Sequence, residues 1–261
     1  MGNPNGLRTV FLILPPMFVL LPLSIIIVVL ERISTSLFTT HTARNWRSGD
    51  STITLYGPTT SDATSLSKYT EVTVRVRVAS TLALLGLSLA AIVVAAIGVC
   101  GIWELRRIEG SPRRQRGWSW VMLVLNTLTM VASVGLLAYL SVLQGNEKRW
   151  KSYADVGKDG QKFTRETWAC QINEFYTSER DWAGPACALD KANRFMLIPL
   201  AVSSALVIFC TWILIHDRGG AKWLVGGKGR YAGFDDTIEL QHPRQDVPKG
   251  GMANNNHTVY L

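Results

Sequence analysis

Four long stretches of this chain contain no charged residue, and charged or polar segments separate them. They run over residues 10–30, 79–103, 119–143 and 195–215, and each is at least 21 residues long. A helix needs roughly 20 mainly apolar residues to cross the hydrocarbon core of a bilayer. The pattern therefore predicts an all-α membrane protein built as a four-helix transmembrane bundle. The first stretch resembles a secretory signal in position, but its length favours a retained anchor.

The segments between the spans predict the topology. Four crossings put residues 1–9 and 216–261 on one side of the membrane, together with the short connector 104–118. Residues 31–78 and 144–194 then form two loops on the other side. The tail after residue 215 is polar and glycine-rich, so we expect it to be mostly disordered.

The first of these loops carries a mixed signal. Val72, Val74, Val76 and Val78 alternate with polar residues, which is the periodicity of a strand. The sequence leaves open whether this segment forms a small β-hairpin, begins the second helix early or is disordered.

Arginines are crowded into the connector 104–118. Lys and Arg near spans remain preferentially on the cytoplasmic side, so we expect the connector and both termini to be cytoplasmic. Two roles of the connector stay open. It is either a solvated loop or a segment that contacts the headgroups of an anionic inner leaflet, where each basic residue contributes roughly 1 kcal/mol of attraction. The net charge of +8 is scattered over loops, which does not favour nucleic-acid binding. The five connector arginines are Arg106, Arg107, Arg113, Arg114 and Arg116.

The four cysteines divide into two pairs. Cys170 and Cys187 lie in the second loop, where a disulfide between them would crosslink the outer region. Such a disulfide forms only in an oxidising compartment. That compartment is opposite the arginines, which agrees with a multi-pass protein of the plasma membrane or the secretory pathway. Cys100 and Cys210 lie near the predicted cytoplasmic ends of their spans, where they either pack as small apolar residues or carry palmitate.

Small residues follow helical spacing in the second span. In lipid they let helices approach closely, so we expect this span to lie at the centre of the bundle. Asn126 is the strongly polar residue of the third span, and we expect it to bond to another helix. No Asp, Glu, Lys, Arg or His lies inside a span, which does not favour an ion pathway. The predicted packing residues are Gly86, Ala90, Ala91, Ala95, Gly98 and Asn126.

The sequence contains no arrangement typical of an enzyme. We find no metal-ligand pattern and no nucleophile paired with a base, so we expect no catalysis, metal or cofactor. The last residues, Val259-Tyr260-Leu261, have the apolar-x-apolar pattern that PDZ domains capture.

The layout of four spans, two larger outer loops and a short inner connector resembles the tetraspan membrane proteins, namely claudins, tetraspanins and MARVEL-domain proteins. The Trp168-Ala169-Cys170 segment with Cys187 is similar to the Trp and Cys pair of claudins, but it lies in the second loop. Cys100-Gly101 matches only part of the Cys-Cys-Gly of tetraspanins and lies inside a span. The resemblance covers residues 10–215 and implies lateral organisation or scaffolding of membrane partners, including self-association. The alternative is an oligomeric channel or transporter for a small uncharged solute or an ion.

Overall fold

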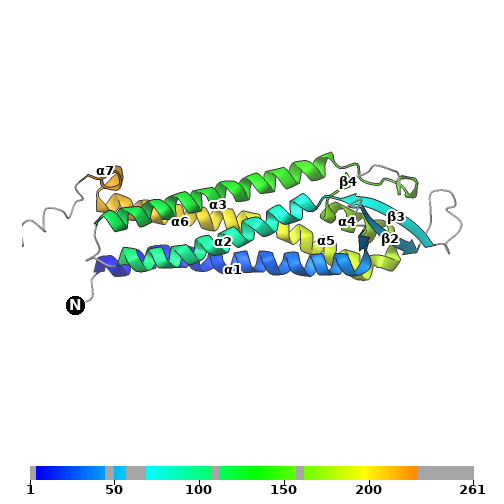
Figure 1. Cartoon of the computed structure of the whole chain (residues 1–261), viewed down its shortest axis with the longest axis horizontal. Coiled ribbons are helices and arrows are strands. Elements are labelled where there is room, and N and C mark those ends of the chain that lie inside the picture. The colour runs from blue at the N-terminus through cyan, green and yellow to red at the C-terminus, as the bar shows by residue number, and fades with distance from the viewer. Residues whose placement is uncertain (1–3, 45–49, 57–68, 107–111, 157–161, 228–261) are drawn as a thin grey trace, which may run out of the picture.

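Four long helical segments form an elongated bundle, and one end of it carries a head of short helices and strands (Figure 1). The computed structural model describes residues 4–44, 50–56, 69–106, 112–156 and 162–227. The predicted fold class is confirmed, since four helical segments are long and apolar enough to cross a membrane. The long helices are α1 (Pro4–His41), α2 (Val78–Arg106), α3 (Pro112–Asn146) and α6 (Leu197–Arg218).

The helices pack in a ring. Helix α1 contacts α2 and α6, and α3 also contacts α2 and α6. Helix α5 (Arg180–Phe195) leads into α6 through Met196 alone, and Met196 keeps helical backbone angles. At the other end, α6 stops at Gly219, whose φ of 130° favours glycine, and the short α7 (Gly220–Leu224) follows.

The helices extend beyond the predicted spans on the head side. Residues 31–41 were predicted as loop, but they continue α1, and α3 continues to Asn146. No Gly or Pro interrupts the chain between Leu30 and His41, so nothing in the local sequence ends the helix there. The apolar spans thus project as helices into the head.

The head contains a four-stranded sheet in the order β1-β2-β3-β4. Strands β2 (Asp50–Tyr56) and β3 (Tyr69–Val76) pair antiparallel, so the first loop forms the hairpin that the valine alternation indicated. Strand β1 (Ala43–Arg44) joins β2, and β4 (Lys162–Phe163) runs parallel to β3. Three further helical elements complete the head before α5, namely η1 (Tyr153–Asp155), α4 (Arg165–Phe175) and η2 (Thr177–Glu179). We use "head" for β1–β4, η1, α4, η2, α5 and the adjoining ends of α1 and α3.

Among the described residues, two large apolar cores hold the molecule together, and a small third cluster joins Ile215 of α6 to Trp223 and Leu224 of α7. The head core surrounds Trp168, whose ring meets that of Phe38 edge to face with the centroids 5.2 Å apart. The bundle core runs along the inner faces of the long helices. Its fully buried members include Ile13, Met17, Leu20, Ile27, Ala91, Ala95, Met122, Leu200 and Val207.

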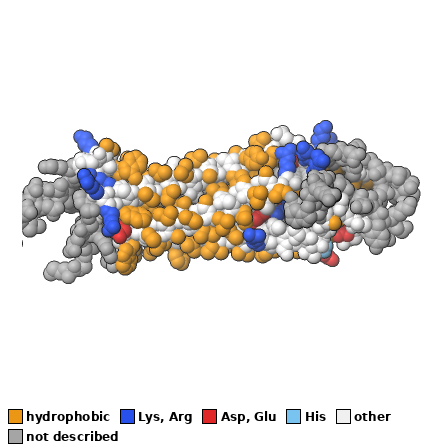
Figure 2. All heavy atoms as spheres, viewed as in Figure 1, with side chains coloured by type: hydrophobic (Ala, Val, Ile, Leu, Met, Phe, Trp, Pro, Cys, Tyr) orange, Lys and Arg blue, Asp and Glu red, His pale blue; other side chains and the backbone are white. Residues whose placement is uncertain are grey.

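The outer surface of the bundle is hydrophobic, and Lys and Arg side chains gather at its two ends (Figure 2). Phe18 is 75% exposed, and Leu128 and Phe209 are each 61% exposed. Large apolar side chains exposed around a whole bundle suit a lipid solvent and would be unfavourable in water. The chain is therefore an integral multi-pass membrane protein.

Candidate functional site at the junction of head and bundle

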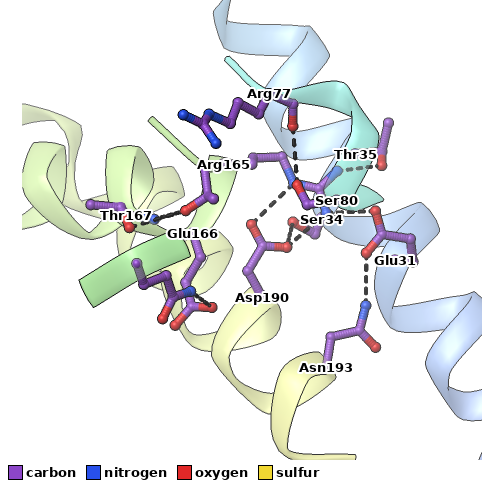
Figure 3. Close-up of polar contacts among 12 residues, drawn as sticks. Glu31, Ser34, Thr35, Arg77, Ser80, Arg165, Glu166, Thr167, Asp190 and Asn193 are labelled. Atoms are coloured by element: carbon purple, nitrogen blue, oxygen red, sulfur yellow. Dashed lines mark hydrogen bonds and ion pairs between the residues drawn. The ribbon is translucent and has the colours of Figure 1, made fainter. Parts of the chain in front are cut away.

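The main polar cluster of the molecule lies where the head meets the bundle, around the buried side chain of Arg165 (Figure 3). Arg165 is the first residue of α4, and the preceding Thr164 caps that helix by accepting from the Thr167 backbone N–H. Arg165 Nη2 lies 2.7 Å from Glu31 Oε1 of α1 and 2.8 Å from Asp190 Oδ1 of α5. Its Nε donates to Asp190 Oδ2 over 3.0 Å, and its Nη1 donates to Thr35 over 2.7 Å.

The carboxylates of this cluster have further partners. Ser34 donates to Asp190 Oδ1, and Asn193 Nδ2 donates to Glu31 Oε2 over 2.7 Å. We call the six residues the clasp; they are Glu31, Ser34, Thr35, Arg165, Asp190 and Asn193. Each comes from α1, α4 or α5, so the clasp joins two helices of the head to the helix that starts the bundle.

Two carboxylates share one guanidinium in the clasp. Burial alone would lower the pKa of Arg165, but Asp190 and Glu31 outweigh burial and raise it above its ordinary value. Arg165 therefore stays charged. A buried ion pair adds little net stability, but removing one partner leaves an unpaired buried charge and is costly. The clasp consequently fixes one arrangement of head and bundle.

A second network lies beside the clasp and brings in α3. Arg194 Nη2 of α5 lies 3.2 Å from Glu166 Oε1 of α4, and Gln144 of α3 donates to the same carboxylate. Arg194 Nη1 also donates to the side-chain amide oxygen, Oε1, of Gln144. Burial raises the pKa of Glu166 above its ordinary value, and this effect outweighs the opposing hydrogen bond from Gln144 and the charge of Arg194. Helix α4 is thus tied to α1, α3 and α5.

The predicted disulfide is present, and it joins α4 to α5. Cys170 and Cys187 are bonded, with their Cα atoms 4.8 Å apart. Beside it, the ring of His41 at the end of α1 stacks on Trp182 of α5 at 4.9 Å between centroids. Trp182 in turn donates its indole N–H to Glu179 over 2.6 Å. The staple and the clasp therefore hold α4 and α5 on the end of the bundle.

The predicted packing residues of α2 fall into two groups. Ala91, Ala95 and Gly98 are buried, and a Cβ added to Gly98 would lie 1.4 Å from Met17 Cε, so the glycine permits the close approach of α1. Gly86 and Ala90 are exposed, and a Cβ on Gly86 would meet nothing within 4 Å. Contrary to the prediction, Gly86 and Ala90 therefore do not pack against another helix of this chain.

Asn126 is fully buried in the bundle, but its amide bonds within its own helix. Its Nδ2 donates to the Met122 carbonyl over 2.8 Å, and its Oδ1 has no hydrogen-bond partner among the described residues. The predicted bond to another helix is not formed. Ser133 also donates to the backbone of its own helix, at Thr129.

The basic end of the bundle lies opposite the head. Arg113 and Arg114 are exposed, whereas Arg116 donates to the Gly227 carbonyl over 2.7 Å and lies 5.7 Å from the ring centroid of Trp223 in α7. The structure describes Arg106 only as the last residue of α2, and Arg107 lies outside the described residues.

The remaining predicted sites are separate from the clasp. Cys100 on α2 is exposed and Cys210 on α6 is half-buried. Residues 259–261, the predicted PDZ ligand, lie outside the described residues. Within the described ranges, no three His, Cys, Asp or Glu side chains group closely enough to hold a metal ion.

No protein-family model, curated protein or solved structure matches this chain. The resemblance to tetraspan proteins therefore stays a prediction, and a functional proposal has to start from the geometry of the chain itself.

Proposed function

We propose that this chain is a non-enzymatic four-span protein that organises membrane partners laterally and presents its head to them. The observation that carries the proposal is the clasp, in which Arg165 of the head holds Glu31 of α1 and Asp190 of α5. Domains within one chain move relative to each other unless their interface prevents it. The buried clasp and the disulfide oppose such motion, so a partner bound to the head is held at a fixed height and orientation above the bilayer.

The lateral surface of α2 supports a second contact, with another membrane helix. Gly86 and Ala90 are four residues apart and exposed, and this spacing allows close helix approach in lipid. Their partner is a second copy of the chain or a span of another protein. The proposal assigns the packing role of these two residues to that contact.

The proposed orientation places the head in an oxidising compartment and the termini in the cytoplasm, in the plasma membrane or a membrane of the secretory pathway. Arg113 and Arg114 are exposed at the basic end, in position to contact anionic lipid headgroups. Cys100 is exposed near the same end and is accessible for palmitoylation from that side.

Site-specific photo-crosslinking of the full chain in native membranes tests the proposal. A photoreactive residue that replaces Asp181, which is exposed on the head, should capture reproducible neighbours. A photoreactive residue that replaces Arg113, which is exposed at the basic end, is the comparison. Gly86→Leu should reduce lateral adducts. Gly135→Leu is its matched control, because Gly135 on α3 is also exposed and has open space around it. Recovery of monomer with no reproducible neighbour would contradict the proposal.

A second candidate function is an oligomeric channel or transporter for a small uncharged solute or an ion. The observation that favours it is Asn126, which keeps a buried amide oxygen without a partner among the described residues. Reconstituted protein should then carry a solute, and Asn126→Ala should reduce the flux. Reconstituted protein without any flux would exclude this candidate.

A further inference from the structure

A cavity of about 340 Å³ lies between α3, α4 and α5, and the Gln144–Glu166–Arg194 network forms part of its wall. Its volume falls within the roughly 300–1,000 Å³ that is typical of small-molecule sites. Charged and polar side chains line it, and they include Gln144, Arg149, Gln171, Glu174 and Lys191.

Gln171 is the unusual residue of this cavity. Its side chain lines the cavity, and the residue is only 3% exposed. Neither its amide nitrogen nor its amide oxygen has a hydrogen-bond partner among the described residues. Leaving a buried donor or acceptor unpaired is unfavourable, because the group has lost its bonds to water and gained none in return. A bound molecule that both accepts and donates hydrogen bonds would remove that cost, so Gln171 points to a polar ligand.

The charges at the rim restrict the ligand further. Arg149 and Lys191 are exposed cations and Glu174 is an exposed carboxylate, and none of them is in an ion pair with another described residue. Arg194 and Glu166, which also line the cavity, neutralise each other. A purely anionic ligand would meet Glu174, and a purely cationic one would meet Arg149 and Lys191. A molecule with both a phosphate and an ammonium group complements the rim.

The cavity also opens at headgroup depth. Ser141 and Gly145 line it from α3, where the predicted span ends at residue 143 and the polar residues Gln144 and Asn146 follow. On the same face of α3, Val134 is 54% exposed and lies about two turns below Ser141 and three turns below Gly145. From Lys191, the positions at helical spacing are Phe195 and Ile198, which are 51% and 46% exposed. Two apolar rows therefore run from the cavity along neighbouring helices.

We propose that this cavity binds the headgroup of a zwitterionic phospholipid. The phosphate lies near Lys191 and Arg149 and accepts from Gln171 Nε2, and the ammonium group faces Glu174 and donates to Gln171 Oε1. The acyl chains follow the two apolar rows of α3 and α6. This binding site does not depend on the proposed scaffolding function, because Arg149, Gln171, Glu174 and Lys191 have no part in that function.

Native mass spectrometry of the full chain in detergent tests the site with short-chain phosphatidylethanolamine and phosphatidylglycerol as probes. The chain should retain one phosphatidylethanolamine at concentrations where phosphatidylglycerol is lost. Soluble phosphoethanolamine should bind at least tenfold more weakly than the lipid, because it lacks the acyl chains that occupy the apolar rows.

Single substitutions separate the contributions of individual side chains to lipid binding. Gln171→Leu and Lys191→Ala should each weaken phosphatidylethanolamine binding about tenfold, the effect of losing one hydrogen bond to a charged group. Lys151→Ala is the matched control, since Lys151 is an exposed lysine of the head that does not line the cavity. Glu174→Gln should weaken binding of phosphatidylethanolamine and strengthen that of phosphatidylglycerol, because the carboxylate that repels the anionic lipid is gone.

Gln171→Leu should also melt no lower than the natural chain in lipid-free detergent, because it removes two unpaired polar atoms. Three results would overturn the proposal: equal retention of both lipids, unchanged binding in Gln171→Leu, or equal affinity for soluble phosphoethanolamine and the lipid.

Discussion

Arg165 Nη2 lies 2.7 Å from Glu31 Oε1, although 134 residues separate the two along the chain. Glu31 follows directly after the first apolar stretch, and Arg165 starts a helix of the head. Their contact defines how the head sits on the bundle. It also makes the arrangement sensitive to single substitutions.

Removal of the clasp arginine should destabilise the protein strongly. Arg165→Met leaves Glu31 and Asp190 buried beside each other without a cation, and losing one partner of such a pair costs about 3–5 kcal/mol. The measurement is the unfolding free energy of the full chain in mixed micelles. Adding Glu31→Gln and Asp190→Asn to Arg165→Met should recover at least half of the loss, because no unpaired charge then remains. An unchanged free energy for Arg165→Met alone would show that the clasp does not couple head and bundle.

Gly86 and Gly98 of α2 should respond in opposite ways to alanine. Gly98→Ala forces a Cβ toward Met17 Cε, and overpacking of this kind costs about 1–3 kcal/mol. Gly86→Ala has open space and gains the better helix propensity of alanine, up to about 1 kcal/mol. Thermal unfolding in detergent should therefore separate the two variants. In a Met17→Ala background, Gly98→Ala should cost less than it does in the natural chain, because the clashing methyl is gone. Equal melting of both single variants would contradict the packing described here.

The four spans and the disulfide could be predicted from the sequence, because a span depends on local composition and a disulfide on the redox chemistry of its compartment. The clasp could not be predicted in this way. Glu31 looked like the first residue of a loop, and nothing near it in the sequence indicates a partner as distant as Arg165. The absence of Gly and Pro after Leu30 was the available signal that α1 continues and carries Glu31 into the head. Gln171 gave no signal, because its burial depends on how α3, α4 and α5 meet.

Loss of the disulfide should loosen the head. Cys170→Ser with Cys187→Ser opens a link that spans 17 residues, which should cost about 3 kcal/mol in the chain-entropy model. Thermal unfolding with and without reductant measures the effect. Cys100→Ser with Cys210→Ser is the matched control and should melt as the natural chain does. If reductant left the melting of the natural chain unchanged, the disulfide would have no stabilising role.

Protonation of Glu166 should stabilise the folded protein. Burial raises its pKa in the folded state above the value of 4.5 for a free side chain, so the folded state binds this proton more tightly than the unfolded state. The stability contributed by the proton is complete below pH 4.5 and is lost as pH rises through the raised pKa. Compared with Glu166→Gln, the natural chain should therefore lose stability across that window. Parallel pH profiles of melting for the two proteins would contradict this.

Sidedness is the premise on which the proposed function depends, and glycosylation measures it directly. The tail carries the acceptor pattern Asn256-His257-Thr258, and Asp62→Asn in the segment between β2 and β3 creates the pattern Asn-Ala-Thr at positions 62–64. We expect the Asp62→Asn chain, expressed in a eukaryotic cell, to gain a glycan that an endoglycosidase removes, and the natural chain to carry none. A glycan on Asn256 of the natural chain would place the tail and the arginine connector on the outer side and would contradict the proposed orientation.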